Sequence, residues 1–372
     1  MRMSIVKNGV RFGLYSILFK LAGTSNYNLI HKYLFKPKIA EFNITENCNG
    51  RCMTCNMWKK KTTNELTTEE IIDLLHQLRE IGISNIVFVG GEPLLRRDLP
   101  KVVKVSKKLG FKYISILTNA LLLTEEKAEE LIRSGINDIG ISIDGIGETN
   151  DKIRGINGHY KKAVSALETL VKLRESKYSH LRIRLSTTLM KPNLSEIPKI
   201  VEMCKERDIS IFLNLLDASL YFLPSYLLED NAGLIVKDKK ELNKLVNKLH
   251  EIKATSPKCL INSHTSLEYI REYFQNPKRE DIPCYLGFFK IYIGSRGDIY
   301  SGCWALPPLG NIREKPLREI INSPEYKQRL INMLKKKCPG CSCGYSQNLL
   351  FHSRSLFEEV LWRAKIKKVK IA

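Results

Sequence analysis

The segment NITENCNGRCMTC, residues 43–55, places three cysteines within one short stretch. Cys48, Cys52 and Cys55 have the spacing C-x3-C-x2-C and directly follow an apolar run, Ile39–Ile44, that predicts a β-strand. Three thiolates this close together can bind one compact iron–sulfur cluster. Because three ligands on a four-iron cube leave one iron open to an outside ligand, the pattern favours chemistry over storage.

A structural zinc site is the alternative interpretation of this segment. Zinc would need a fourth ligand nearby, and none of the seven histidines lies between Cys48 and Trp58. The N-terminus lacks the apolar core and small-residue cleavage site of a secretory signal. We therefore expect a cytoplasmic protein whose clustered cysteines bind metal and do not form disulfides.

Apolar runs and helical stretches alternate along the chain after this segment. Helix starts are indicated by Thr67 with Glu70 as a capping box, and by Thr124. With the strand before the cysteines, the pattern gives six β-α units, which predicts a parallel sheet covered by helices, with its chemistry at the carboxyl ends of the strands. The further strands are expected at Ile86–Val89, Tyr113–Leu117, Asp138–Ile143, Leu181–Ser186 and Ile209–Leu216.

Four more motifs follow the cysteines, at or near strand ends. They read GGEP at 90–93, TNA at 118–120, SIDG at 142–145 followed by NDKIRG at 150–155, and RLSTT from Arg184. With the cysteine spacing, this order resembles the radical S-adenosylmethionine (SAM) superfamily over about residues 39–220. The family usually has TNG where Ala120 stands, and His is common where Asn150 stands.

The resemblance implies a fold, a cofactor and a reaction. The fold is α/β, a partial (β/α)6 TIM-like barrel, and the SAM contacts fall on Gly90, Gly91, Glu92, Thr118, Ser142 and Arg184. The glycines allow close backbone approach, and Arg184 can pair with the SAM carboxylate. Cys48, Cys52 and Cys55 hold a [4Fe-4S] cluster that reductively cleaves SAM to a 5′-deoxyadenosyl radical, which abstracts hydrogen from a substrate. No residue is assigned as a catalytic acid or base.

A second group of cysteines lies toward the C-terminus. Phe288–Ile293 and Asp298–Tyr300 predict a hairpin, flanked by two cysteines that can meet a later pair in space. The layout resembles the auxiliary-cluster domains called SPASM or, when shortened, twitch. The full SPASM pattern has seven cysteines for two clusters, so the five here favour one auxiliary [4Fe-4S] cluster, with a zinc site as the alternative. The candidate ligands are Cys284, Cys303, Cys338, Cys341 and Cys343, whereas Cys204 and Cys259 are expected to be buried apolar residues.

Charge and the chain ends bear on the substrate. Lys and Arg number 60 against 39 for Asp and Glu, a net charge of +21, which favours an anionic partner or a solvated lysine-rich surface. Residues 1–40 contain no acidic residue and carry helically spaced apolar residues, which predicts either a membrane-surface helix or a helix packed on the catalytic domain. No nucleic-acid motif accompanies the charge, so we expect no nucleic-acid partner.

The whole pattern predicts a radical SAM enzyme acting in the cytoplasm or at a membrane surface. Its substrate is expected to be a small molecule, lipid-linked or phosphorylated, with ferredoxin or flavodoxin as electron donor. A peptide-modifying maturase, a non-catalytic iron–sulfur electron carrier and a zinc-binding nucleic-acid module are the alternatives. The expected divisions are a basic amphipathic segment at 1–38, the radical SAM core at 39–235, the auxiliary domain at 236–345 and a basic helix at 346–372.

Overall fold

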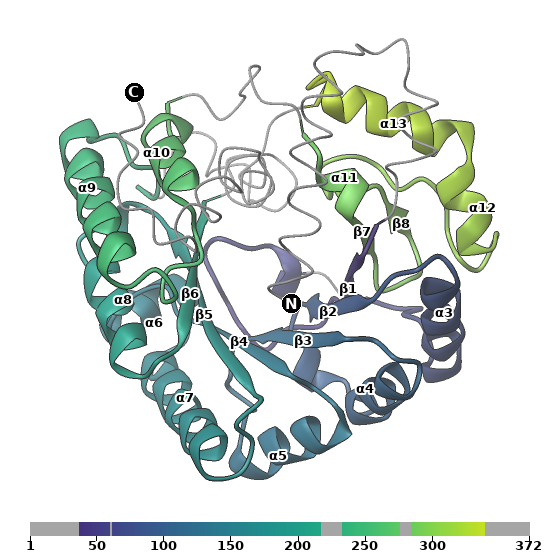
Figure 1. Ribbon diagram of the computed structural model, residues 1–372, viewed down its shortest axis with the longest axis horizontal. Coiled ribbons are helices and arrows are strands. Elements are labelled where there is room, and N and C mark those ends of the chain that lie inside the picture. The colour runs from purple at the N-terminus through teal and green to yellow at the C-terminus, as the bar shows by residue number, and fades with distance from the viewer. Residues whose placement is uncertain (1–36, 60–61, 217–232, 276–283, 339–372) are drawn as a thin grey trace.

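The computed structural model describes residues 37–59, 62–216, 233–275 and 284–338. Six consecutive parallel strands form the body of one open sheet, in which each of the first five pairs with the next along the chain (Figure 1). All six predicted strands and the α/β fold class are confirmed. The strands are β1 (Ile39–Thr45), β2 (Asn85–Gly90), β3 (Tyr113–Thr118), β4 (Asp138–Ser142), β5 (Arg182–Leu189) and β6 (Ser210–Leu215).

Helices connect these strands and cover the outer face of the sheet (Figure 1). Thr67 and Glu70 form the predicted capping box at the first of them, and the Thr124 side chain caps another. Alternate strand residues such as Phe42, Phe88 and Ile116 are fully buried in the core. The helices are α3 (Thr68–Glu80), α4 (Leu99–Lys108), α5 (Glu125–Ser134), α6 (Glu148–Arg154), α7 (His159–Ser176) and α8 (Ile197–Glu206), with 3-10 turns η2 (Met57–Lys59), η3 (Pro93–Leu95) and η4 (Lys191–Asn193).

The predicted C-terminal hairpin is present, and it belongs to the same sheet. β7 (Lys290–Ile293) pairs antiparallel with β8 (Ile299–Tyr300) and parallel with β1, where Ile39 lies opposite Lys290. The strand order is therefore β6-β5-β4-β3-β2-β1-β7-β8. The domain division at residue 235 stays a prediction, but the hairpin that it assigns to the auxiliary domain extends the sheet of the core. α11 (Leu286–Phe289) directly precedes this hairpin, and α12 (Leu317–Asn322) and α13 (Pro324–Leu334) follow it.

Two helices follow β6 in the described residues 233–275. α9 (Lys239–Thr255) packs against α10 (His264–Tyr273), and Leu260 between them forms a parallel bridge with Ile211 of β6. In the part of the chain that the structure describes, no helix is long and apolar enough to cross a bilayer. The predicted N-terminal and C-terminal basic helices lie outside the described residues, except for residues 37–38.

Candidate functional site

The three clustered cysteines lie on the loop that follows β1, at the carboxyl edge of the sheet. Cys48, Cys52 and Cys55 are each partly exposed. The backbone N–H of Gly50 donates to the Cys48 sulfur over 3.3 Å, and that of Met57 donates to the Cys55 sulfur over 3.4 Å. Burial raises the pKa of Cys48 to about 11. The loop therefore has three thiols that could serve as soft metal ligands, and metal binding would drive their deprotonation.

The two glycines of the GGEP segment are required by the backbone of this same loop. A Cβ on Gly91 would lie 2.2 Å from the Asn47 carbonyl oxygen, and one on Gly90 would lie 2.2 Å from that of Thr45. The Gly91 N–H donates to the Thr45 carbonyl over 2.7 Å. The structure places protein backbone against these glycines, and their contact with SAM stays a prediction. Their closeness fixes the cysteine loop against the end of β2.

Glu92 is fully buried and fixes the end of β3. Its carboxylate accepts hydrogen bonds from the Thr118 hydroxyl (2.6 Å), the Asn119 N–H (2.8 Å) and the Leu94 N–H (3.1 Å). Burial is the main cause of its raised pKa, against these hydrogen bonds. A carboxylate has about four acceptor positions, so one remains for a further donor such as an ammonium group. Thr118, which the sequence predicted as a SAM contact, is directed at Glu92.

The segment after Thr118 also contacts the cysteine loop. The Asn119 side-chain amide donates to the Asn49 side chain over 2.7 Å. Ala120 has φ +64°, a conformation that favours glycine, and this is the position where the resembling family usually has glycine. The departure from the family pattern therefore keeps the glycine conformation and adds a methyl group that is almost fully buried.

Ser142 and Asp144 lie at the end of β4 and just beyond it. Ser142 is the last residue of β4, so it lies at the carboxyl edge of the sheet, and it is buried. Asp144 accepts the Thr188 N–H over 2.7 Å and forms an ion pair with Arg154 over 2.7 Å. Asp144 therefore holds other protein groups, in agreement with a structural role.

Arg154 is the site residue that the sequence analysis did not single out. Its guanidinium lies 3.9 Å from the Cys52 sulfur, and its buried Nε has no hydrogen-bond partner among the described residues. Two backbone bonds, from Arg51 to the Arg154 carbonyl and from Met53 to the Ile153 carbonyl, tie α6 to the cysteine loop. The sequence signal that could have identified Arg154 is its place in the NDKIRG segment, residues 150–155. A buried cation here can stabilise thiolate charge.

The structure does not place Arg184 beside the cysteine loop, and its contact with SAM stays a prediction. Its guanidinium forms an ion pair with Asp138 over 2.7 Å and donates to the Ser115 hydroxyl over 3.0 Å. Asp138 begins β4 and Arg184 is the third residue of β5, so the pair lies toward the amino ends of the strands. The cysteines lie at the opposite end. The arginine instead neutralises a buried carboxylate.

The C-terminal cysteines are only partly covered by the described residues. Cys284 is buried just before α11, Cys303 follows β8 and Cys338 follows α13, whereas Cys341 and Cys343 lie outside the described residues. A Cβ on Gly287 would lie 2.5 Å from the Ser301 carbonyl, so the segments that carry the first two cysteines pack closely. Within the described ranges, no three His, Cys, Asp or Glu side chains are gathered to hold one metal ion. As predicted, Cys204 and Cys259 are buried.

The amino-acid sequence matches two family models and several characterised proteins. Residues 42–213 match the radical SAM superfamily and residues 284–344 match SPASM, an iron–sulfur cluster-binding domain. The chain is 28% identical to the Fe-coproporphyrin III synthase of Methanosarcina barkeri, over 82% of this chain and 78% of that protein. It is 33% identical to the PqqA peptide cyclase of Bradyrhizobium diazoefficiens, over 46% of this chain and 44% of that protein.

Solved structures share the fold at low sequence identity. Streptococcus suis SuiB bound to SAM has a TM-score of 0.63 at 17% identity, covering 85% of this chain and 73% of that chain. The protein anSMEcpe with bound SAM and a peptide has a TM-score of 0.62 at 20% identity, covering 89% of this chain and 98% of that chain. Together the two domains, the parallel sheet and the cysteine loop show that the chain belongs to the radical SAM superfamily, as an enzyme whose core binds a [4Fe-4S] cluster and SAM and whose SPASM domain binds auxiliary iron–sulfur clusters.

Proposed function

We propose that Cys48, Cys52 and Cys55 hold the [4Fe-4S] cluster and leave one iron open to SAM. The three cysteines share one loop, and backbone donors face two of the sulfurs. The Arg154 guanidinium beside Cys52 offsets part of the negative charge that the ligands bring. When bound, the reduced cluster supplies one electron to the sulfonium of SAM, which yields methionine and a 5′-deoxyadenosyl radical that takes hydrogen from a substrate. The position of this loop at the carboxyl edge of the sheet carries the proposal.

The remaining core residues would position SAM. Glu92 keeps one acceptor position for the SAM amino group while its other bonds hold Thr118 and the backbone of the next loop. The glycines Gly90 and Gly91 act by seating the cysteine loop, and Ser142 offers a hydroxyl at the end of β4. Arg184 is left out because it is committed to Asp138 at the other end of the strands.

For the second site, we assign one auxiliary cluster to the C-terminal cysteines. The SPASM match from residue 284 to residue 344 supports this, because it spans all five of them. Four thiolates close such a cluster with no open position, which favours electron relay over substrate binding. The assigned ligands are Cys284, Cys303, Cys338 and Cys341, and Cys343 can replace either of the last two.

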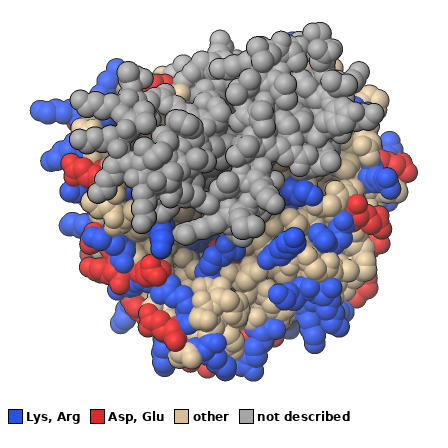
Figure 2. Space-filling model, viewed as in Figure 1, with Lys and Arg blue, Asp and Glu red and all other residues tan. Residues whose placement is uncertain are grey.

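For the substrate, we infer an anion. The net charge is +21, and Lys and Arg side chains are spread over the described part of the surface in Figure 2. A lipid-linked or phosphorylated molecule supplies phosphate charge, and a porphyrin like that named for the Methanosarcina barkeri relative supplies carboxylate charge. The same basic surface suits an acidic ferredoxin or flavodoxin as electron donor, and it suits an anionic membrane. An acidic peptide is the second candidate substrate, because a peptide cyclase is among the relatives.

The test is anaerobic SAM cleavage. The full chain is reconstituted with iron and sulfide, reduced with dithionite, and assayed for 5′-deoxyadenosine alone and with Fe-coproporphyrin III, anionic liposomes, a phosphorylated lipid or a peptide. Cys52→Ala should abolish the product. Cys259→Ala, which removes a buried thiol elsewhere, is the matched control and should retain it.

The substrate arms separate the candidates. A rise in 5′-deoxyadenosine with one anionic compound supports the anion assignment and identifies its class. Stimulation by neutral or cationic substrates alone contradicts the anion assignment. Equal product from Cys52→Ala and the intact chain would refute the assignment of the cluster to this loop.

A further inference from the structure

The tip of the C-terminal hairpin is docked on the segment that follows the cysteine loop. The Leu66 N–H donates to the Ser295 carbonyl over 2.8 Å. Gly297 has φ +92°, and a Cβ there would lie 3.3 Å from the Leu66 side chain and 2.7 Å from that of Ile312. Glycine is therefore required where the hairpin tip meets its neighbours.

A turn at residues 310–313 is fastened to the same hairpin. The Asn311 side-chain amide donates to the Arg296 carbonyl and to the Asp298 carboxylate, each over 3.0 Å. The Ile312 N–H donates to the Gly297 carbonyl over 3.0 Å. The hairpin tip and the turn thus form one unit, which we call the brace (residues 294–298 and 310–313).

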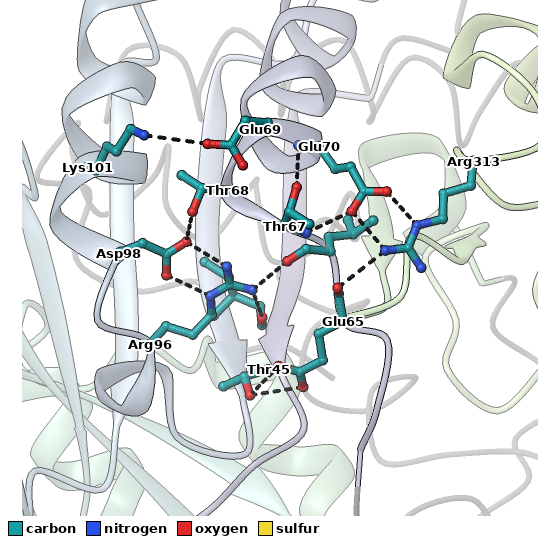
Figure 3. A network of polar contacts seen from close by, with 12 residues as sticks. Thr45, Glu65, Thr67, Thr68, Glu69, Glu70, Arg96, Asp98, Lys101 and Arg313 are labelled. Atoms are coloured by element: carbon teal, nitrogen blue, oxygen red, sulfur yellow. Dashed lines mark hydrogen bonds and ion pairs between the residues drawn. The ribbon is translucent and has the colours of Figure 1, made fainter.

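Arg313 extends from the brace to the core, as Figure 3 shows. Its guanidinium makes two bonds to the Glu70 carboxylate, of 2.6 and 2.8 Å. It also donates to the carbonyls of Asn64 (3.0 Å) and Glu65 (3.3 Å). The hydrogen bond from Arg313 lowers the pKa of Glu70 to about 2. One side chain therefore holds the segment 64–70 through two backbone carbonyls and a charged pair.

The segment held by Arg313 also closes the neck of the cysteine loop. The Glu65 carboxylate accepts the Thr45 hydroxyl (3.0 Å) and the Glu46 N–H (2.7 Å), so it joins the two ends of the loop (Figure 3). Arg96, paired with Asp98, bridges the same ends by donating to the Ile44 and Leu66 carbonyls. All three cysteines lie between these closed ends.

We propose that Arg313 is a positioning residue for the loop that carries Cys48, Cys52 and Cys55. The C-terminal unit, which is assigned to the auxiliary cluster, thereby sets the geometry of the SAM-cleaving site. The effect on SAM cleavage rests on the proposed function, whereas the contact between Arg313 and the neck of the cysteine loop does not. Fixing the neck reduces the conformational freedom of the loop ends, so the loop opens less often and the three thiols stay longer in the positions seen in the structure.

The experiment measures the position of the loop in the metal-free full chain. Individual cysteines are alkylated under reducing, anaerobic conditions and their rates are read by peptide mass spectrometry, with hydrogen exchange of residues 43–66 as a second readout. Because a charge-assisted pair contributes roughly a factor of ten, Arg313→Ala should speed alkylation of the three loop cysteines about tenfold. Buried Cys204 and Cys259 should keep their rates. Arg313→Lys should fall between, because it keeps a charged donor for Glu70 but has fewer donors for the Asn64 and Glu65 carbonyls.

Arg207→Ala is the matched control. Arg207 forms a similarly exposed pair with Glu168, through bonds of 2.8 and 2.7 Å, far from the neck of the loop. Equal alkylation of the loop cysteines in Arg313→Ala and Arg207→Ala would overturn the proposal. An equal rise at all mapped cysteines would also overturn it, because that pattern indicates general loosening. If the intact chain failed to cleave SAM, the proposed function would fail while a selective alkylation result still stood.

Discussion

Two glycines three residues apart provide a matched test of how α6 seats the cysteine loop. Gly155 has φ +67° and Gly158 has φ +77°. A Cβ on Gly155 would lie 2.2 Å from the Arg51 carbonyl oxygen, whereas one on Gly158 would meet nothing within 4 Å. Both Ala substitutions cost about 1 kcal/mol for the left-handed conformation, so the difference between them isolates the contact with the loop.

The expected loss of stability in Gly155→Ala depends on whether the cysteine loop moves away from the new methyl group or stays in place. If the loop moves away from Gly155→Ala, it loses the bonds from Arg51 to the Arg154 carbonyl and from Met53 to the Ile153 carbonyl, each contributing about 1 kcal/mol. If it stays, overpacking costs about 1 to 3 kcal/mol. Either way, we expect Gly155→Ala to lower the free energy of unfolding by about 2 kcal/mol more than Gly158→Ala does.

The assay is urea unfolding of the metal-free, reduced protein, with the midpoint and slope compared between the two variants. Iron per chain after reconstitution is the second readout, and it should fall in Gly155→Ala and remain near the intact value in Gly158→Ala. Equal losses of stability in both variants would refute the reasoning, because they would show that the Arg51 carbonyl gives way without cost.

Three further predictions concern buried groups. Arg184→Met should lower the free energy of unfolding by about 3 to 5 kcal/mol, because it leaves Asp138 buried without its partner, and calorimetric SAM affinity should be unchanged if the pair is structural. Glu92→Gln should cost about 1 to 3 kcal/mol in urea unfolding and weaken SAM binding, because backbone N–H donors face both carboxylate oxygens and one would then face the amide nitrogen. Burial lowers the pKa of His264 from its usual 6.5 to about 4, so between these pH values the unfolded chain binds more protons than the folded chain. The free energy of unfolding should therefore fall as the pH drops from about 6.5 to about 4. His264→Gln should reduce this slope.

Much of the core was predictable because its signals are local. Apolar runs and capping residues located six strands and their helices, since burial of one face and satisfaction of helix ends depend on near neighbours. The largest difference is at β5, which continues to Leu189 because its last residues pair with β6. The cysteine spacing likewise indicated a cluster site, because three thiols on one short loop can meet without help from distant segments.

The roles of single polar residues were less predictable. Arg184 and Arg154 are both basic residues within motif segments, and the resemblance pointed to Arg184 as a SAM contact. Their partners decide between them, because Asp138 holds Arg184 at one end of the strands and Asp144 holds Arg154 beside Cys52. Those pairs join residues on different elements, and spacing along the chain does not encode them.

By itself, the sequence determined the α/β core, the cysteine loop and the presence of a second cysteine group. The tertiary structure decided that β7 joins the sheet beside β1, where Ile39 lies opposite Lys290, 251 residues further along the chain. It also decided that Arg313 reaches the neck of the cysteine loop. Strand addition at a sheet edge uses backbone hydrogen bonds, which any sequence can make, so it leaves little trace in residue types. Only the folded chain brings these distant segments together.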